Sequence, residues 1–285
     1  MILFRKADDL TDFLLKQRNN GLRTGFVPTM GALHQGHISL IRQARESNDL
    51  VICSVFINPT QFNDPSDFEK YPVTIENDVD LLQAAGCDIL FFPSVDEMYP
   101  PGLPVKTYDL GFLETILEGK FRPGHFQGVC RVIDRFLTLI HPDNFYLGQK
   151  DYQQCLVVRR LITILGLEQQ VSLVITPTLR DPDGLAMSSR NTRLSPDQRE
   201  QAVNIFRALS SIAAGMNQFP PELLISDAVA RLESEGFRVD YVEIASANDL
   251  QPYQTTLPEE PLVALAAAFL GDVRLIDNML LPPRS

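Results

Sequence analysis

Short apolar runs alternate with amphipathic stretches along the first 178 residues of the chain. Residues 51–56 are apolar almost throughout, which is typical of a strand that helices cover on both faces. Similar runs predict further strands, and helical spacing of apolar residues between them predicts helices. The expected strands are 25–29, 50–56, 88–92, 144–147 and 173–176, and the expected helices are 38–46, 75–85, 129–140 and 152–165. This alternation predicts an α/β fold with a doubly wound parallel sheet.

The pattern changes after Arg190. Ser195, Pro196 and Gln198 supply an N-cap, a proline at the first helical position and a capping-box partner, so a long helix is expected there. A second helix near 221–235 and strand-like runs at 238–244, 262–270 and 273–276 predict a smaller α+β unit. We expect one domain over 1–178 and a second over 179–285.

Residues 117–128 are rich in glycine and contain Pro123, Lys120 and Arg122. This composition predicts an exposed loop within the first domain. A surface connection without catalytic part and a segment that covers the site are both open interpretations.

Charge and cysteine content narrow the class of protein. The 285 residues carry a formal net charge of -11, which disfavours nucleic acid as a partner, because binding it normally needs clustered lysine and arginine. The N-terminus has no signal-peptide pattern, and no apolar run approaches the roughly 20 residues of a membrane helix. Four widely spaced cysteines lie in apolar surroundings, Cys53, Cys87, Cys130 and Cys155, and this pattern predicts reduced buried thiols. We therefore expect a cytoplasmic protein, and the lack of a long apolar run predicts no membrane partner.

The sharpest local motif is residues 28–37, P-T-M-G-A-L-H-Q-G-H, between the first predicted strand of the doubly wound region and a helix. Ligands bind beyond the carboxyl ends of such strands, where helix N-termini offer N–H groups to anions. His34 and His37 are three residues apart and can share one side of the first helical turn. Packed core histidines and a metal-ligand pair are the alternatives, but no nearby carboxylate or cysteine completes a zinc set.

Three weaker polar clusters also follow predicted strands or lie at the expected domain junction. Residues 148–154, G-Q-K-D-Y-Q-Q, offer Lys150 to phosphate, Asp151 to a ribose hydroxyl and Gln154 to the same side. Residues 183–191 combine two serines with Arg190, which suits a leaving pyrophosphate. Residues 56–62 contain Gln61, and with Gln154 it is a neutral donor for an acid substrate whose charge must not be quenched. Each cluster taken alone is also consistent with a solvated loop or turn.

Together these motifs resemble the pantothenate synthetase family. The order is P-T-M-G-A-L-H-x-G-H, F-x-N-P-x-Q-F, Y-P-x-T, R-P-G-H-F-x-G-V, G-x-K-D-Y-Q-Q and M-S-S-R-N, and residues 270–278 resemble the family's ending. The resemblance implies a Rossmann-like nucleotidyltransferase domain, a C-terminal lid domain, a homodimer, and ATP with Mg²⁺. The sequence departs from the wider H-x-G-H synthetase group at Ala186, the position at which the K-M-S-K-S motif of that group begins with lysine. We expect Lys150 to supply the missing positive charge.

The resemblance also assigns residues to ligands. The implied ATP-binding residues are Met30, Gly31, Ala32, Leu33, His34, Gln35, Gly36, His37, Gly148, Gln149, Lys150, Asp151, Leu179, Met187, Ser188, Ser189 and Arg190. Gln61 and Gln154 would hold pantoate, and Gln61 would also lie near β-alanine. His37 has the principal catalytic assignment, with His34, Lys150 and Arg190 stabilising charge, while the metal ligands stay unassigned.

The sequence therefore predicts an ATP-dependent ligase that condenses pantoate with β-alanine through a pantoyl adenylate, releasing pyrophosphate and AMP. Another H-x-G-H nucleotidyltransferase and a non-catalytic nucleotide-binding regulator are the alternatives. His125 and His141 are expected to have local structural roles.

Overall fold

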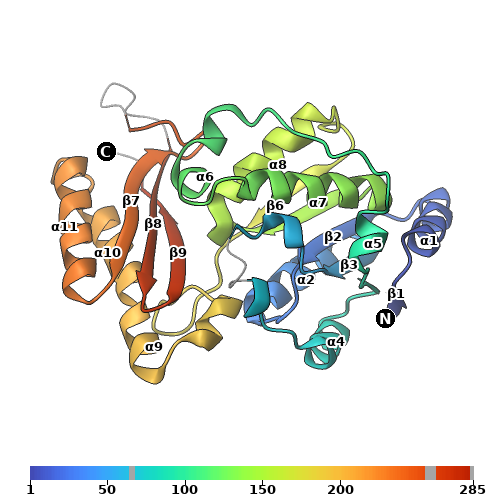
Figure 1. Ribbon diagram of the computed structural model, residues 1–285, viewed down its shortest axis with the longest axis horizontal. Coiled ribbons are helices and arrows are strands. Elements are labelled where there is room, and N and C mark those ends of the chain that lie inside the picture. The colour runs from blue at the N-terminus through green and yellow to red at the C-terminus, as the bar shows by residue number, and fades with distance from the viewer. Residues whose placement is uncertain (64–67, 254–260, 283–285) are drawn as a thin grey trace. The chain divides into compact units, whose positions relative to one another are not determined.

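The computed structural model describes residues 1–63, 68–253 and 261–282 (Figure 1). The chain divides into two compact units. The first contains Met1–Gly148 and Val157–Pro177, and the second contains Gln149–Leu156 and Thr178–Ser285. The division therefore crosses the chain directly after Gly148, which separates the predicted Lys150 segment from the strand that precedes it in sequence.

The first unit is built on a six-stranded parallel sheet of order β1-β4-β3-β2-β5-β6. Its strands are β1 (Ile2–Phe4), β2 (Thr24–Thr29), β3 (Leu50–Val55), β4 (Ile89–Phe91), β5 (Asn144–Gly148) and β6 (Ser172–Thr176). The five predicted strands are confirmed, and β1 is an addition. From β2 the chain continues to β3 on one side, while β5 pairs with the other side of β2. The carboxyl ends of β2 and β5 thus form the topological switch point where such sheets bind ligands.

Helices cover both faces of this sheet. The helices of this unit are α1 (Ala7–Asn19), α2 (Gln35–Ser47), α4 (Ile75–Ala84), α5 (Val95–Met98), α6 (Leu117–Phe121), α7 (His125–Ile140) and α8 (Tyr152–Ile164), with the 3-10 turns η1 (Pro59–Gln61) and η2 (Gly111–Glu114). The start of α8, up to Leu156, belongs to the second unit. Val27, Cys53 and Leu90 pack with the apolar sides of α2 and α4. On the other face, Phe136 of α7 meets Phe26 edge to face at 5.1 Å. The central strands are buried because both of their faces have a helical layer.

The expectation of an exposed loop over residues 117–128 is wrong. The segment contains α6 and the start of α7, and Leu117 and Gly119 are buried. A Cβ on Gly119 would lie 2.3 Å from the Glu114 carbonyl oxygen, so this glycine permits close packing. Gly124, with φ +79°, is the N-cap of α7. The glycines that suggested a loop therefore serve close contact and helix initiation.

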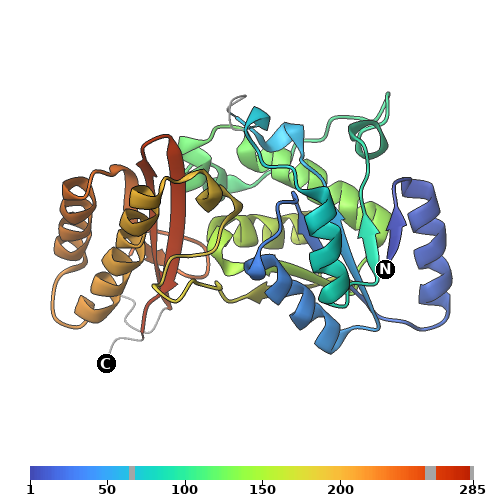
Figure 2. The ribbon, with the colours of Figure 1, turned by 90° about the horizontal axis from the view of Figure 1, so that it is seen from below.

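The second unit pairs a three-stranded antiparallel sheet with helices. The strands are β7 (Arg238–Ser246), β8 (Leu262–Leu270) and β9 (Val273–Leu280), and the other elements are η3 (Gln149–Asp151), η4 (Ser189–Arg193), α9 (Pro196–Ala202), α10 (Asn204–Gly215) and α11 (Pro221–Ser234). α10 and α11 cover one face of the sheet (Figure 2). Alanines in β8, such as Ala264 and Ala266, are buried against the helices in this unit's core. The predicted α/β fold with a smaller α+β unit is confirmed.

The start of the second unit's helical part follows the sequence signal. Ser195 is the N-cap, and its side chain and that of Gln198 form the reciprocal capping box. The single long helix expected there is wrong, because the structure has α9 and α10 with Val203 between them. Val203 keeps right-handed backbone angles, φ -61° and ψ -21°, which local residue preference does not distinguish from an unbroken helix.

The cysteine prediction is also confirmed, since Cys53, Cys87, Cys130 and Cys155 are free and buried. Burial raises the pKa of Cys87 to about 12, and burial likewise raises the pKa of Cys130 to about 12. Within the described ranges, none of the helices combines the length and apolarity needed to cross a membrane.

Candidate active site

A tight turn at the carboxyl end of β2 connects the sheet to α2. Gly31 and Ala32 both have left-handed backbones, with φ +83° and +50°. Such a backbone is rare for alanine, and it persists only where surrounding contacts fix it. A Cβ on Gly31 would lie 3.0 Å from a Val55 methyl group and 3.1 Å from Asp78. The turn is therefore packed tightly against β3 and α4.

Asp78 of α4 holds this turn through its backbone. Its carboxylate accepts N–H groups from Ala32 at 2.9 Å and from Leu33 at 2.8 Å, and the Thr74 hydroxyl at 3.0 Å. The side chain is buried, and only 1% of the residue is exposed. Sequence reasoning missed Asp78, although an acid on the same helix face as Ile75 and Leu82 is a usable signal that it has a buried partner.

His34 and His37 lie together on the first turn of α2, as the motif predicts. Their ring centroids are 4.1 Å apart. His34 is the N-cap, and its Nδ1 accepts the Gly36 N–H at 3.1 Å, while Nδ1 of His37 accepts the His34 N–H at 3.3 Å. A neutral imidazole has one N–H, so each ring carries its hydrogen on Nε2. Both histidines are thus prepared as Nε2–H donors beside a helix N-terminus.

Gln61 ends the short η1 turn that follows β3. Its Nε2 donates to the Met30 sulfur at 2.9 Å, and its Oε1 accepts from Asn58 Nδ2 at 3.1 Å. Asn58 is buried, caps η1 by accepting the Thr60 N–H, and also donates to the Gly128 carbonyl at 3.1 Å. The side chain of Gln61 is therefore held between the β2 turn and the start of α7.

The first turns of α7 support the backbone of η1. Arg122 donates to His125 Nε2 at 3.1 Å, and since a guanidinium only donates, His125 Nδ1 carries the hydrogen that it gives to the Gln61 carbonyl at 2.8 Å. A Cβ on Gly128 would lie 2.0 Å from the Thr60 carbonyl oxygen. His125 thus has a structural role, as expected, because it holds the backbone carbonyl of Gln61. No sequence signal distinguished this contact.

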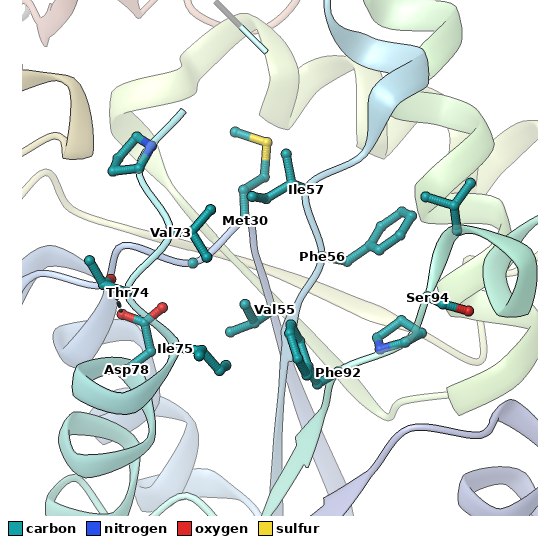
Figure 3. A pocket seen from close by; sticks show the side chains of 14 residues that line it. Met30, Val55, Phe56, Ile57, Val73, Thr74, Ile75, Asp78, Phe92 and Ser94 are labelled. Atoms are coloured by element: carbon teal, nitrogen blue, oxygen red, sulfur yellow. Dashed lines mark hydrogen bonds between the residues drawn. The ribbon is translucent and has the colours of Figure 1, made fainter. Parts of the chain in front are cut away.

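A cavity of about 230 Å³ lies beyond the carboxyl ends of β2, β3 and β4 (Figure 3). Met30 and Ile57 line one part of it, and Phe92 and Ser94 another. Asp78 and Thr74 contribute its polar edge, where they are hydrogen-bonded to each other. Met30 therefore borders this cavity and also contacts Gln61.

The second unit contains the other predicted residues except Gly148, which ends β5 in the first unit. Lys150 lies in η3 with its ammonium 3.5 Å from Asp151 Oδ1, and its side chain is 17% exposed. Gln154 is half-buried in the first turn of α8. The Gln149 side chain donates to Asn278 Oδ1 at 3.2 Å. Lys150 thus belongs, by its contacts, to the same unit as the serine–arginine segment.

That segment begins as a small hairpin. The Leu179 carbonyl accepts the Met187 N–H at 3.1 Å, and Arg180 and Ala186 form an isolated antiparallel β-bridge. Ser188 then caps η4, its hydroxyl accepting the Arg190 N–H at 3.3 Å. Arg199 of α9 pairs with Asp183 at 2.8 Å, and this hydrogen bond holds the pKa of the Asp183 carboxyl below its ordinary value. The hairpin therefore has a fixed turn before the residues that were predicted to bind phosphate.

The structure thus gathers the predicted residues in two groups. One, in the first unit, contains residues 30–37, Gln61 and Gly148, and the other, in the second unit, contains residues 149–151, Gln154, Leu179 and 187–190. Among the residues that the structure describes, there is no set of three His, Cys, Asp or Glu side chains placed to hold a metal ion. The buried Asp78 carboxylate is already used by three protein donors, so it does not fit a magnesium ligand.

The chain matches one protein family over nearly its whole length. The family model described as Pantoate-beta-alanine ligase matches residues 2–280. The chain belongs to this family. Its members are ligases of pantothenate biosynthesis, so the resemblance seen in the motifs is confirmed and the chain is an enzyme.

Individual members of the ligase family are similar over their whole length. A pantothenate synthetase from Cytophaga hutchinsonii is 41% identical over 286 residues, covering 99% of each chain. The crystal structure of pantothenate synthetase from Thermus thermophilus superimposes with a TM-score of 0.91 at 40% identity and covers 99% of this chain and 100% of its own. Pantoate-beta-alanine ligase from Francisella tularensis, complexed with beta-gamma ATP and beta-alanine, has a TM-score of 0.81 at 36% identity, with 98% and 97% coverage.

Proposed function

We propose that this member of the ligase family activates pantoate with ATP as a pantoyl adenylate and then transfers the acyl group to β-alanine. Family membership and the Francisella relative, which is complexed with beta-gamma ATP and beta-alanine, support the substrates. The observation that carries the nucleotide assignment is the pair of imidazoles on the first turn of α2, whose Nδ1 atoms both accept backbone N–H groups. Donors at a helix N-terminus stabilise phosphate oxygens through both hydrogen bonds and the helix dipole.

The proposed ATP site joins both groups of residues. β2 and β5 are paired neighbours, the histidine turn follows β2, and Lys150 follows the end of β5 by two residues. This order supports residues 30–37 and 148–151 acting on one nucleotide. Leu179 and residues 187–190 complete it in the proposal, with residues 1–178 as the ATP- and pantoate-binding domain and 179–285 as the lid.

Gln61 and Gln154 are the proposed pantoate-binding residues. In the structure, the Gln61 amide donates to the Met30 thioether, which is a weak acceptor. A carboxylate is a much stronger acceptor, so pantoate displaces this contact without facing a quenching positive charge. The half-buried Gln154 supplies a second neutral donor. β-Alanine is proposed to approach the same Gln61.

The reaction then proceeds as two displacements. A pantoate carboxylate oxygen attacks the α-phosphorus, the bond from that phosphorus to the bridging oxygen breaks, and pyrophosphate leaves. The neutral β-alanine amine attacks the acyl carbon, loses a proton, and AMP leaves with its phosphate oxygen. His37 and His34 donate to the growing negative charge, while Lys150 and Arg190 supply positive charge.

Three further assignments belong to this proposal. Mg²⁺, when bound with ATP, would neutralise phosphate charge; among the described residues no set of three His, Cys, Asp or Glu side chains would hold it. The lid excludes water, because the mixed anhydride is readily hydrolysed. The enzyme works as a cytoplasmic homodimer.

The test separates the two displacements. Pantoate-dependent exchange between ATP and labelled pyrophosphate, measured without β-alanine, reports adenylate formation; β-alanine is then added and AMP is measured. Exchange that needs β-alanine would contradict the adenylate. ATP binding without exchange would indicate a nucleotide-binding regulator, and exchange that is independent of pantoate would indicate another nucleotidyltransferase.

Variants refine the assignment. His37→Ala should lower the exchange rate by roughly 10²- to 10³-fold, the scale of a lost transition-state donor. His141→Asn is the matched control, because His141 is the exposed C-cap of α7. Gln154→Ala should raise the KM for pantoate and leave that for ATP nearly unchanged. Weaker ATP binding with normal pantoate binding in Gln154→Ala would contradict the pantoate role.

A further inference from the structure

Asn278 of β9 holds the turn that carries Lys150. Its Nδ2 donates to the carbonyl oxygens of Gln149 at 2.9 Å and of Lys150 at 2.8 Å, and its Oδ1 accepts from the Gln149 side chain at 3.2 Å. Only 1% of Asn278 is exposed. An amide nitrogen has two hydrogens, and both are used by consecutive carbonyls of this one turn. The contact is therefore specific to η3.

The neighbouring residue holds the other proposed nucleotide segment. The Asp277 carboxylate accepts hydrogen bonds from both terminal nitrogens of Arg180, at 2.5 and 3.0 Å. Arg180 also donates to the Gly184 carbonyl at 3.1 Å and to the Asn278 carbonyl at 3.1 Å, so it connects the hairpin before Ser188 to β9. Burial raises the pKa of the Asp277 carboxyl, and the paired Arg180 opposes that rise.

Strand β9 gives both contacts a rigid base. Asn278 pairs with Leu265 and Asp277 with Ala266 in the antiparallel ladder with β8. Lys150 has a flexible four-carbon stem, so the direction of its ammonium depends on the backbone from which the stem starts. Fixing the carbonyls of residues 149 and 150 fixes that starting direction. A displacement of about 1 Å in such a charge is enough to cost roughly 10²-fold in rate.

We propose that Asn278 is a positioning residue for Lys150 in adenylate formation. The inference rests on the proposed function, which gives Lys150 the task of stabilising phosphate charge. Asn278 acts through the two backbone carbonyls and contacts no substrate. Asn278 holds the Lys150 turn to strand β9. The pair of Asp277 and Arg180 holds the serine–arginine segment to the same strand within the second unit.

The first measurement compares kcat and KM for pyrophosphate exchange. Asn278→Ala removes both donors and should lower kcat by about 10- to 100-fold, with the KM for pantoate within about 2-fold of its original value. Asn278→Asp keeps the shape but turns an oxygen toward two carbonyls, so it should lower kcat at least as much. A rise in the pantoate KM with unchanged kcat would overturn the proposal.

A double-mutant cycle tests whether the effect passes through Lys150. If it does, adding Asn278→Ala to Lys150→Met should lower kcat by less than about 2-fold further, because the group being positioned is already gone. Fully additive losses would overturn the positioning role and leave the proposed function standing. Unchanged kcat in Lys150→Met would instead show that the proposed role of Lys150 is wrong, and this inference would fall with it.

Asp240→Asn provides the matched control for lost stability. Asp240 belongs to the same sheet and accepts from Arg274 at 2.8 Å, with its side chain 8% exposed. Its replacement should lower the thermal midpoint while exchange kcat stays within about 2-fold below that midpoint. An equal kcat loss in Asp240→Asn and Asn278→Ala would identify a general effect of weakening the sheet and overturn the proposal.

Discussion

Asp78 accepts the backbone N–H of Leu33 at 2.8 Å, across 45 residues of chain. Its second oxygen accepts the N–H of Ala32, whose left-handed backbone starts the turn before His34 and His37. One buried carboxylate thus fixes the path of the chain into α2. The placement of both imidazoles depends on a residue that lies outside the motif.

Asp78→Ala should therefore affect both stability and nucleotide use. It leaves the buried N–H of Leu33 and the partly buried N–H of Ala32 without their charged acceptor, which should lower the free energy of unfolding by about 2 to 4 kcal/mol. The milder Asp78→Asn should lower kcat/KM for ATP in pyrophosphate exchange by roughly 10- to 100-fold. Urea unfolding and exchange at varied ATP measure the two effects. Asp80→Asn, an exposed acid on the same helix, is the control and should change neither.

Gly128→Ala should weaken pantoate binding in particular. The new methyl group would lie 2.0 Å from the Thr60 carbonyl oxygen, so η1 and Gln61 must move. We expect the pantoate KM to rise by roughly 10-fold or more while the ATP KM stays nearly constant, with stability lowered by about 1 to 3 kcal/mol. Steady-state kinetics with each substrate varied in turn measures this.

Gly21→Ala is the control for that variant. Gly21 has φ +79°, and a Cβ added there would have no neighbouring atom within 4 Å, so alanine costs stability through backbone strain alone. Its pantoate KM should stay unchanged. A folded Gly128→Ala enzyme with normal pantoate KM would show that Gln61 does not depend on this packing.

His141→Asn should reduce the loss of stability in mild acid. Although His141 is largely exposed, partial desolvation of its ring, and secondarily Arg18, lower its pKa below the ordinary 6.5. The unfolded chain therefore takes up the proton first, and stability falls as the pH drops from 6.5 to the lower folded pKa. Asparagine does not take up this proton, so it removes the pH-dependent loss of stability, and it also suits the left-handed C-cap, φ +46°. Urea unfolding between pH 8 and 5 should give a flatter profile; an identical profile would contradict the prediction.

The native thiols should be slow to alkylate. Burial raises the pKa of Cys87 and of Cys130 to about 12 and that of Cys53 well above its ordinary value. At pH 8 the thiolate fraction of a group with pKa 12 is about 1 in 10⁴, and the thiolate is the reactive species. Iodoacetamide labelling followed by mass spectrometry should show little modification until urea is added. Rapid labelling of Cys87 in the native protein would show that the segment before β4 opens readily.

The sequence by itself determined the parallel sheet, the smaller α+β unit and the family. Apolar runs such as residues 51–56 report burial on both faces, and the capping box at Ser195 reports a helix start, because each signal is local. The H-x-G-H motif likewise predicted the paired imidazoles, since their spacing on a helical turn fixes their approach.

Tertiary structure alone decided how the predicted residues are held. Asp78 binds the N–H of Leu33, His125 binds the carbonyl of Gln61, and Asn278 binds the carbonyl of Lys150, across 45, 64 and 128 residues. Every residue except proline offers the same backbone donor and acceptor, so the letters of a sequence do not reveal which distant side chain will take them. Only the folded chain brings these partners within hydrogen-bonding distance.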